Sequence, residues 1–257
     1  MTRRNLIFTA AAALNAPANS SAMNKKAIFE LRYIRMRNGT QIQRTSDFLS
    51  RHFLPAAKRA GLGPVGLFNA LIAEQSPFVL SLTSYSSISA METATDKLYS
   101  DKEFQHGLEE YNSMSELGYM RMENSLLRAF DSIPQIEVPP TSADRAPRVF
   151  ELRTYESNNS KAGKRKVKMF DDAEISIFRR CGMLPVFFAE TLIGRNLPNL
   201  TYMLAFDDLA AREQAWKKFL ADPEWIKLRA QPGLTDPEIV SNISNAILRP
   251  LPFSQIK

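Results

Sequence analysis

The sequence predicts an α+β protein made of two tandem copies of one β-α-β-β-α-β unit. The first observation is an internal repeat, because Phe29-Glu30-Leu31-Arg32 recurs 121 residues later as Phe150-Glu151-Leu152-Arg153. The register continues without a gap, and about 20 of roughly 100 aligned residues are identical, where chance at ordinary composition gives about six. The second observation is the length of each copy, which suits a small domain and exceeds that of solenoid repeats. The third is that strand and helix patterns follow the same order in both copies.

The repeat divides the chain into four parts. Residues 1–26 precede it, residues 27–130 form the first copy, residues 131–148 form a linker, and residues 149–257 form the second copy. The linker contains Pro134, Pro139, Pro140 and Pro147, so we expect it to be extended and stiff. With 44% hydrophobic and 23% charged residues, the 257-residue chain has the composition of a folded globular protein.

The second copy opens with a pattern typical of a strand. Its two faces are Phe150, Leu152 and Thr154 on one side, and Glu151, Arg153 and Tyr155 on the other. This alternation predicts a strand with one apolar face. A glycine-containing polar loop follows it.

Helical spacing appears next, and it ends at Gly182, a residue suited to the end of a helix. The apolar positions at this spacing are Val167, Phe170, Ile177, Phe178 and Cys181. Cys181 is the only cysteine and aligns with Ala60, so we interpret it as a small buried residue at a helix end rather than a nucleophile.

The remaining elements complete the unit. Residues 185–193 and 200–206 are apolar runs separated by a turn, which predicts a hairpin. Helices are expected to begin after Asp208 and at Asp222-Pro223-Glu224-Trp225, where aspartate is the N-cap and proline is the first helical residue. Residues 245–249 supply the last strand. The order is that of a ferredoxin-like unit, an antiparallel sheet covered by helices on one face.

The other face of each sheet needs a partner, and the duplication supplies it. Two such sheets packed face to face would form a closed or nearly closed barrel with its helices outside. In that arrangement we expect the first strand of the second copy to point its Glu151, Arg153 and Tyr155 side into the barrel, beside the equivalent Glu30 and Arg32 of the first copy.

The first 26 residues have the features of a targeting segment. Arg3-Arg4 precedes a short apolar stretch from Leu6 to Leu14, which is too short to span a bilayer. The segment resembles a twin-arginine export signal cleaved near Ala22, which predicts a periplasmic or secreted protein. Two alternatives are a mitochondrial presequence and translation that begins at Met23, which would leave the protein cytoplasmic.

Three motifs stand out: FELR and FELRTY at the starts of the copies, a glycine followed by Pro-Val after the first helix, and Asp-Pro-Glu-Trp. Together they resemble the NIPSNAP family of the dimeric α/β-barrel superfamily, which implies a dimeric-type α/β barrel. The resemblance covers residues 27–130 and 149–250 and is stronger in the second copy, because the first has Lys102 and Phe104 in place of Pro223 and Trp225. It implies a binding or adaptor protein, although the superfamily also includes cofactor-free oxygenases, isomerase-like enzymes and haem-handling proteins.

The sequence lacks the residues and motifs of most recognisable catalytic, metal-binding and nucleotide-binding sites. The only histidines, His52 and His106, align with Ala173 and Lys227, which disfavours a metal site or a histidine triad. The sequence has no phosphate-binding loop, GxGxxG or CxxC motif, so it implies no cofactor. The net charge is +6, and its one basic cluster, residues 161–168, is interpreted as a solvated loop and helix start. The alternative for that cluster is an anion or nucleic-acid patch.

The candidate ligand-binding residues are therefore Glu151, Arg153, Tyr155, Glu30 and Arg32, which could hold an anionic or phenolic ligand. The alternative is a salt bridge that only satisfies buried charges. We expect an exported, homo-oligomeric small-molecule-binding or adaptor protein, without catalysis, nucleic acid or a membrane span. The second hypothesis is a cofactor-independent oxygenase or isomerase-like enzyme for an aromatic or quinone-like metabolite, and the third is a structural module. A cavity of several hundred cubic ångströms would favour the first two.

Overall fold

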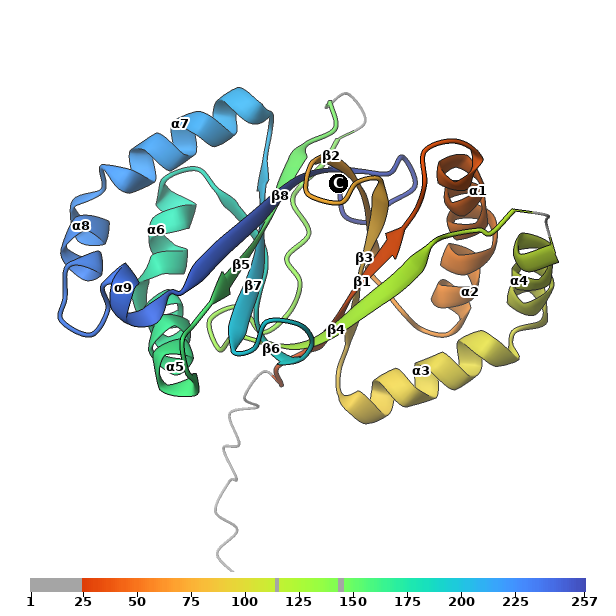
Figure 1. The fold of residues 1–257 in the computed structure, drawn as a ribbon, viewed down its shortest axis with the longest axis horizontal. Coiled ribbons are helices and arrows are strands. Elements are labelled where there is room, and N and C mark those ends of the chain that lie inside the picture. Colours follow the sequence, from red (N-terminus) through yellow and green to blue (C-terminus); the bar gives the residue numbers. More distant parts are fainter. Residues whose placement is uncertain (1–24, 114–115, 143–145) are drawn as a thin grey trace, which may run out of the picture.

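The computed structural model describes residues 25–113, 116–142 and 146–257, and within them eight antiparallel strands form one closed barrel. The strand order around the barrel is β1-β3-β2-β8-β5-β7-β6-β4. Helices flank the barrel in two groups, one beside each half of the chain (Figure 1). The predicted α+β fold of two paired β-α-β-β-α-β halves is confirmed. The twin-arginine motif and the apolar stretch after it lie outside the described residues.

The elements of the two halves correspond one to one, apart from an additional short helix in the second. The first half contains β1 (Ile28–Arg35), α1 (Thr40–Phe48), the π-helical turn η1 (Leu49–Phe53), α2 (Leu54–Arg59), β2 (Gly66–Ile72), β3 (Phe78–Tyr85), α3 (Ile88–Ser100), α4 (Lys102–Ser113) and β4 (Arg121–Ala129). The second contains β5 (Val149–Glu156), α5 (Ser160–Met169), η2 (Phe170–Glu174), α6 (Ile175–Arg180), β6 (Leu184–Ile193), β7 (Asn199–Phe206), α7 (Leu209–Leu220), α8 (Pro223–Arg229), α9 (Asp236–Ile239) and β8 (Asn242–Pro250).

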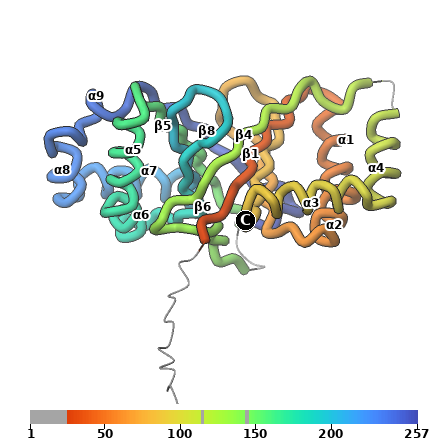
Figure 2. The backbone as a smooth tube through the Cα atoms, turned by 90° about the horizontal axis from the view of Figure 1, so that it is seen from below, coloured from red at the N-terminus to blue at the C-terminus, as the bar shows by residue number. Residues whose placement is uncertain are grey.

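Two seams join the halves, β4 with β6 and β2 with β8. Figure 2 shows β4 running beside β6. In one seam Leu127 lies opposite Thr191, and in the other Leu248 lies opposite Ala70. These two pairs are related by the sequence offset of 121 residues, and the register irregularity falls at the equivalent place in each seam. The barrel therefore has a pseudo-twofold axis, and neither half is left with an unpaired sheet edge.

The predicted helix ends are confirmed and explain several residues that both copies share. Gly182 has a φ of 89° just after α6, and the side chain of Asp222 accepts hydrogen bonds from the backbone of Glu224 and Trp225 at 2.9 and 3.1 Å. Asp222 also pairs with Arg180 at 2.7 Å. In the first copy Arg59 and Asp101 form the same pair at 2.6 Å. We name these two pairs the helix clamps.

The barrel interior is apolar at the end where β1 and β5 begin. Phe29 contacts Phe187 with ring centroids 5.5 Å apart, and Phe68 contacts Phe150 at 4.9 Å. Segments outside the strands cover this end. The backbone of Ala27 donates to Pro134 in the linker, and the side chain of Ile256, near the end of the chain, is fully buried among the interior residues. Phenylalanine, leucine and alanine side chains thus fill this part of the narrow lumen.

Two smaller expectations have mixed outcomes. Cys181 is buried at the end of α6, as expected. The sequence predicts that the basic cluster at 161–168 is a solvated loop and helix start. It lies wholly within α5, so the helix part is confirmed and the loop part is wrong, and its Lys166 is buried rather than solvated. None of the described helices is long and apolar enough to cross a membrane.

Candidate functional site

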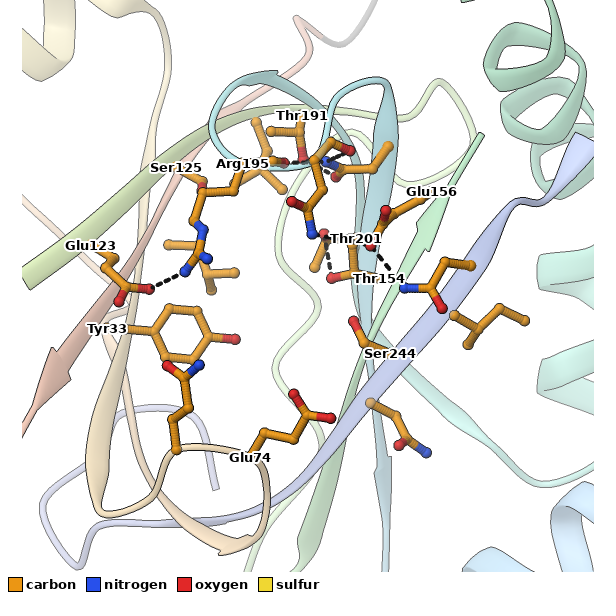
Figure 3. Close-up of a pocket in the computed structure, with 18 of the residues that line it drawn as sticks. Tyr33, Glu74, Glu123, Ser125, Thr154, Glu156, Thr191, Arg195, Thr201 and Ser244 are labelled. Carbon is orange, nitrogen blue, oxygen red and sulfur yellow. Dashed lines mark hydrogen bonds and ion pairs between the residues drawn. The ribbon is translucent and has the colours of Figure 1, made fainter. Parts of the chain in front are cut away.

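The apolar side chains that fill the barrel where β1 and β5 begin are called the apolar plug below. A cup of about 670 Å³ opens at the opposite end of the barrel. Its walls are the last residues of β1 and β5 and the first residues of β4 and β8. The hairpin loops β2–β3 and β6–β7 form its rim (Figure 3). We call this cavity the mouth cup.

The cup exists because inward-facing side chains become polar along each strand. On β5, Phe150 and Leu152 are inside the barrel core, whereas Thr154 and Glu156 line the cup. On β4, Leu127 is followed outward by Ser125, Glu123 and Arg121, which occupy the same face by strand alternation. Each strand therefore contributes its apolar end to the plug and its polar end to the cup.

One wall of the cup is basic and is organised around Glu123. Arg35 donates to both carboxylate oxygens of Glu123, at 2.9 and 3.1 Å. Arg121 donates to the same carboxylate at 2.8 Å, and Arg195 from the β6–β7 loop donates at 3.2 Å. The hydrogen bonds from Arg35 lower the pKa of Glu123 to about 2, against the opposing effect of burial. One carboxylate thus faces three guanidinium groups, which leaves an excess of two positive charges on this wall, 3 − 1 = 2.

The other wall is acidic. The carboxylate of Glu156 accepts hydrogen bonds from two neutral amides, Asn196 at 3.1 Å and Asn242 at 3.0 Å. Glu74, on the β2–β3 loop, extends its carboxylate into the cup and is paired with no side chain of the described residues (Figure 3). Neither carboxylate on this wall is neutralised by a cation among the described residues.

Tyr33 projects from β1 on the basic side, with its hydroxyl directed into the cup (Figure 3). The guanidinium of Arg35 lies over its ring, 4.8 Å from the centroid, and the ring of Phe78 contacts it at 5.0 Å. Burial raises the pKa of Tyr33 to about 12, and Arg35 lowers it less. The hydroxyl therefore stays protonated at neutral pH, available to donate a hydrogen bond to a molecule in the cup.

The five residues predicted from sequence lie elsewhere. Glu30, Arg32, Glu151, Arg153 and Tyr155 are on the outer, helix-covered faces of β1 and β5 rather than inside the barrel. The expected alternation is correct, but the assignment of its two faces to the inside and the outside is wrong. Apolar side chains fill a narrow lumen without needing partners, whereas a carboxylate and a guanidinium need partners that helix side chains can supply.

In the second half the structure brings the predicted residues together in a buried network. Glu151 is fully buried and accepts from Arg153 at 2.9 Å, from Arg212 at 2.7 and 2.8 Å, and from the indole nitrogen of Trp216 at 2.7 Å. Burial opposes ionisation of Glu151, but the hydrogen bonds from Arg212 and the charge of Arg153 outweigh it and hold its pKa below the usual value. Arg153 also donates to Tyr155 at 3.2 Å. These contacts fit the alternative interpretation of a structural ion-pair network.

In the first half Glu30 and Arg32 also pair, at 2.6 Å, and Glu30 accepts from the hydroxyl of Tyr85 at 3.0 Å. The Glu30–Arg32 pair and the Glu151–Arg153 pair have no partner in common, because each pair is contacted by residues of its own half. The five residues therefore form two separate clusters.

Sequence reasoning missed every residue that lines the mouth cup. The signal was present in the alternation of the first strand of each copy. Arg35 and Glu156 are on the same strand face as the apolar residues of β1 and β5, and on the opposite face from the Glu-Arg pairs. A correct choice of the inward face would have led directly to both.

A family model for NIPSNAP matches residues 150–255. The second half of the chain is a NIPSNAP domain. No curated protein matches the chain.

Solved structures resemble the NIPSNAP half together with the first half. A provisionally named monooxygenase from Fusobacterium nucleatum is 11% identical, with a TM-score of 0.55, over 88% of this chain and 93% of its own. A provisionally named monooxygenase from Lactobacillus acidophilus is 10% identical, with a TM-score of 0.54, over 87% and 93%. An anthrone oxidase-like protein is 9% identical, with a TM-score of 0.51, over 88% and 92%. These likenesses show the shared dimeric α/β-barrel fold, and the long coverage shows that both halves match.

Neither the NIPSNAP half nor the rest of the described residues contains a group of three or more histidine, cysteine, aspartate or glutamate side chains placed to hold a metal ion. Guanidinium, carboxylate, amide and hydroxyl groups line the cup instead. This chemistry suits the binding of a small charged molecule by hydrogen bonds and ion pairs.

Proposed function

We propose that this protein binds a small polar molecule in the mouth cup. The observation that carries the proposal is the cup itself, a cavity of about 670 Å³ whose walls present charged groups and the protonated hydroxyl of Tyr33. Its volume lies within the range of small-molecule sites, and its polar groups converge on one space.

The hypothesis of an enzyme for an aromatic or quinone-like metabolite has weaker support. The names of the structural neighbours favour an oxygenase, and Tyr33 could serve as a general acid. However, a large planar apolar substrate needs an apolar cavity, and the apolar part of this lumen is occupied by the paired rings of Phe29, Phe187, Phe68 and Phe150. Oxygen consumption by the protein in the presence of anthrone, absent in Tyr33→Phe, would favour the enzyme.

The test of binding fills the cup. Ser244 lines it from β8, so Ser244→Trp should occupy much of its volume. Arg249→Trp is the matched control, because Arg249 lies on the same strand and is exposed on the outer face. Saturation-transfer NMR would be run with a panel of small carboxylates, amines and amino acids.

Signals from one or more panel members that survive in Arg249→Trp and vanish in Ser244→Trp are the expected result. Signals that are equally strong in both variants would show that the molecules bind elsewhere. The absence of any signal with the wild-type protein would also contradict the proposal.

We also propose that the protein is exported from the cytoplasm. The support for export is Arg3-Arg4 and the apolar stretch that follows. Sequencing of the mature native protein should find its N-terminus between Ala16 and Asn24, and replacement of Arg3-Arg4 by two lysines should retain it in the cytoplasm. An intact N-terminus on a cytosolic protein would contradict export.

A further inference from the structure

We propose that the molecule bound in the mouth cup carries an acidic group at one end and an amino group at the other. This inference rests on the proposed function and narrows it to a class of ligand, the ω-amino acids and other zwitterions with separated charges. The carrying observation is the opposition of the two charged walls.

The charges are reversed at equivalent positions of the two halves. Arg35 at the end of β1 corresponds, 121 residues later, to Glu156 at the end of β5. Glu74 in the first hairpin loop corresponds to Arg195 in the second. The backbone of the mouth is therefore pseudo-symmetric, whereas its electrostatic field is dipolar.

The topology gathers like charges on one side. Strand β6 lies next to β4, so Arg195 joins Arg35 and Arg121 on the sector formed by β6, β4 and β1. Strand β2 lies next to β8, so Glu74 and Glu156 share the sector formed by β2, β8 and β5. In the strand order these two sectors are on opposite sides of the barrel, separated by β3 and β7.

Among the described residues, each wall keeps a net charge that is not neutralised by side chains of its own or of the opposite wall. On the basic wall Glu123 is shared by three arginines, and the exposed Arg195 uses only one of its nitrogens in that contact. On the acidic wall Glu156 has only amide donors. No ion pair in the described residues crosses the cup. The charges are thus available to a ligand that places opposite groups against each wall.

A ligand that carries the same charge at both ends would suit only one of the two walls. A dicarboxylate would pair with Arg195 and bring its second carboxylate towards Glu74 and Glu156, where like charges repel. A diamine would meet the converse problem at the arginines. Tyr33, on β1 of the basic sector, can donate a hydrogen bond to the acidic end of a bound ligand.

The experiment uses isothermal titration calorimetry with the whole chain and probes of matched length. The central set is δ-aminovalerate, glutarate and cadaverine. Sets built on γ-aminobutyrate and ε-aminocaproate, each with the dicarboxylate and diamine of equal length, cover shorter and longer spans. We expect one ω-amino acid to bind at least about tenfold more tightly than its matched dicarboxylate and diamine.

Two variants assign the ends. Arg195→Gln should weaken binding of the ω-amino acid and of the dicarboxylate, but not of the diamine. Glu74→Gln should weaken binding of the ω-amino acid and of the diamine, but not of the dicarboxylate. Both residues are exposed, so the fold should be retained, and Arg249→Gln on the outer face of β8 is the control for a change of net charge.

The inference fails if a dicarboxylate or diamine binds as tightly as the matched ω-amino acid, or if Glu74→Gln leaves the affinity for the ω-amino acid unchanged. It also fails, with the proposed function intact, if no member of these sets binds while other molecules give signals that Ser244→Trp removes. Loss of both ideas would require that no signal depends on Ser244.

Discussion

In both halves the outer face of the sheet carries a glutamate, an arginine and an asparagine at equivalent positions, in very different surroundings. In each half a glutamate pairs with the arginine two residues later and accepts from an asparagine of the neighbouring strand, Asn124 at 3.0 Å or Asn245 at 3.3 Å. Glu151 is fully buried, whereas the side chain of Glu30 is 14% exposed. The same motif is therefore a buried network in one half and a partly exposed pair in the other.

The difference comes from the helix that covers each strand. Helix α7 places Arg212 and Trp216 on Glu151, and the residues aligned with them in the first half are Met91 and Thr95, which contribute no such contacts. A strand motif thus does not determine its own environment, because the partners that bury it come from elsewhere in the sequence.

A second contrast between the two halves lies in the helical segment that follows the first strand of each. Lys166 and Glu174 pair at 2.9 Å with both side chains 1% exposed. Burial raises the pKa of Glu174, and Lys166 opposes this effect. The residues aligned with them are Thr45, which shares a hydrogen bond with Tyr111, and Phe53. The second half thus buries an ion pair where the first has a buried threonine and a partly buried phenylalanine.

The largest effect should follow from breaking that ion pair. Lys166→Met would leave Glu174 buried without a cation and should lower the free energy of unfolding by about 5 kcal/mol, the upper end for such pairs. The double change Lys166→Met with Glu174→Leu should recover much of the loss, because no charge is then left unpaired. Urea denaturation measures both. A double variant no more stable than Lys166→Met would contradict the buried pair.

The next effect compares the two strand motifs directly. Glu151→Gln leaves Arg153 and Arg212 without a carboxylate and should cost about 3 kcal/mol. Glu30→Gln makes the same change in the partly exposed pair and should cost about 1 kcal/mol or less. Equal losses in urea denaturation would show that the covering helix makes no difference.

A smaller, pH-dependent effect is expected from Glu123. Because its folded pKa of about 2 lies below the ordinary 4.5, its contribution is complete above pH 4.5 and is lost as the pH falls towards 2. At neutral pH Glu123→Gln should cost about 2 kcal/mol, allowing for partial exposure, and the difference from wild type should shrink through that window. Glu156→Gln is the matched variant on the opposite wall, where the lost donors are neutral, and should cost less. A difference for Glu123→Gln that is constant with pH would contradict the assignment.

The smallest effects should come from the helix clamps, and they should be alike. Arg59→Met and Arg180→Met each remove an exposed ion pair of the same geometry, so thermal unfolding should shift slightly and by similar amounts. Unequal shifts would show that the clamps, despite their shared residues, are not equivalent in the two halves.

The architecture could be predicted from the sequence because one constant offset relates the two copies throughout. The offset that aligns Phe29 with Phe150 also aligns both seams, and capping residues such as Asp208 and Asp222 act on helices immediately next to them. The site was not predictable in the same way. Alternation gives two faces and does not say which one is inside, since that depends on whether Glu151 finds its partners on α7 or across the lumen.

The pairing of both halves in one chain has a consequence for what the mouth can recognise. In a dimer of identical subunits each side chain occurs twice about the axis, so an arginine on one wall would be matched by an arginine facing it. Here Arg35 faces the sector of Glu156, and Arg195 faces that of Glu74. Covalent fusion freed the two copies to mutate separately, so natural selection could give this opening a polarity, and hence a preferred orientation for its guest, that no homodimer of either half could possess.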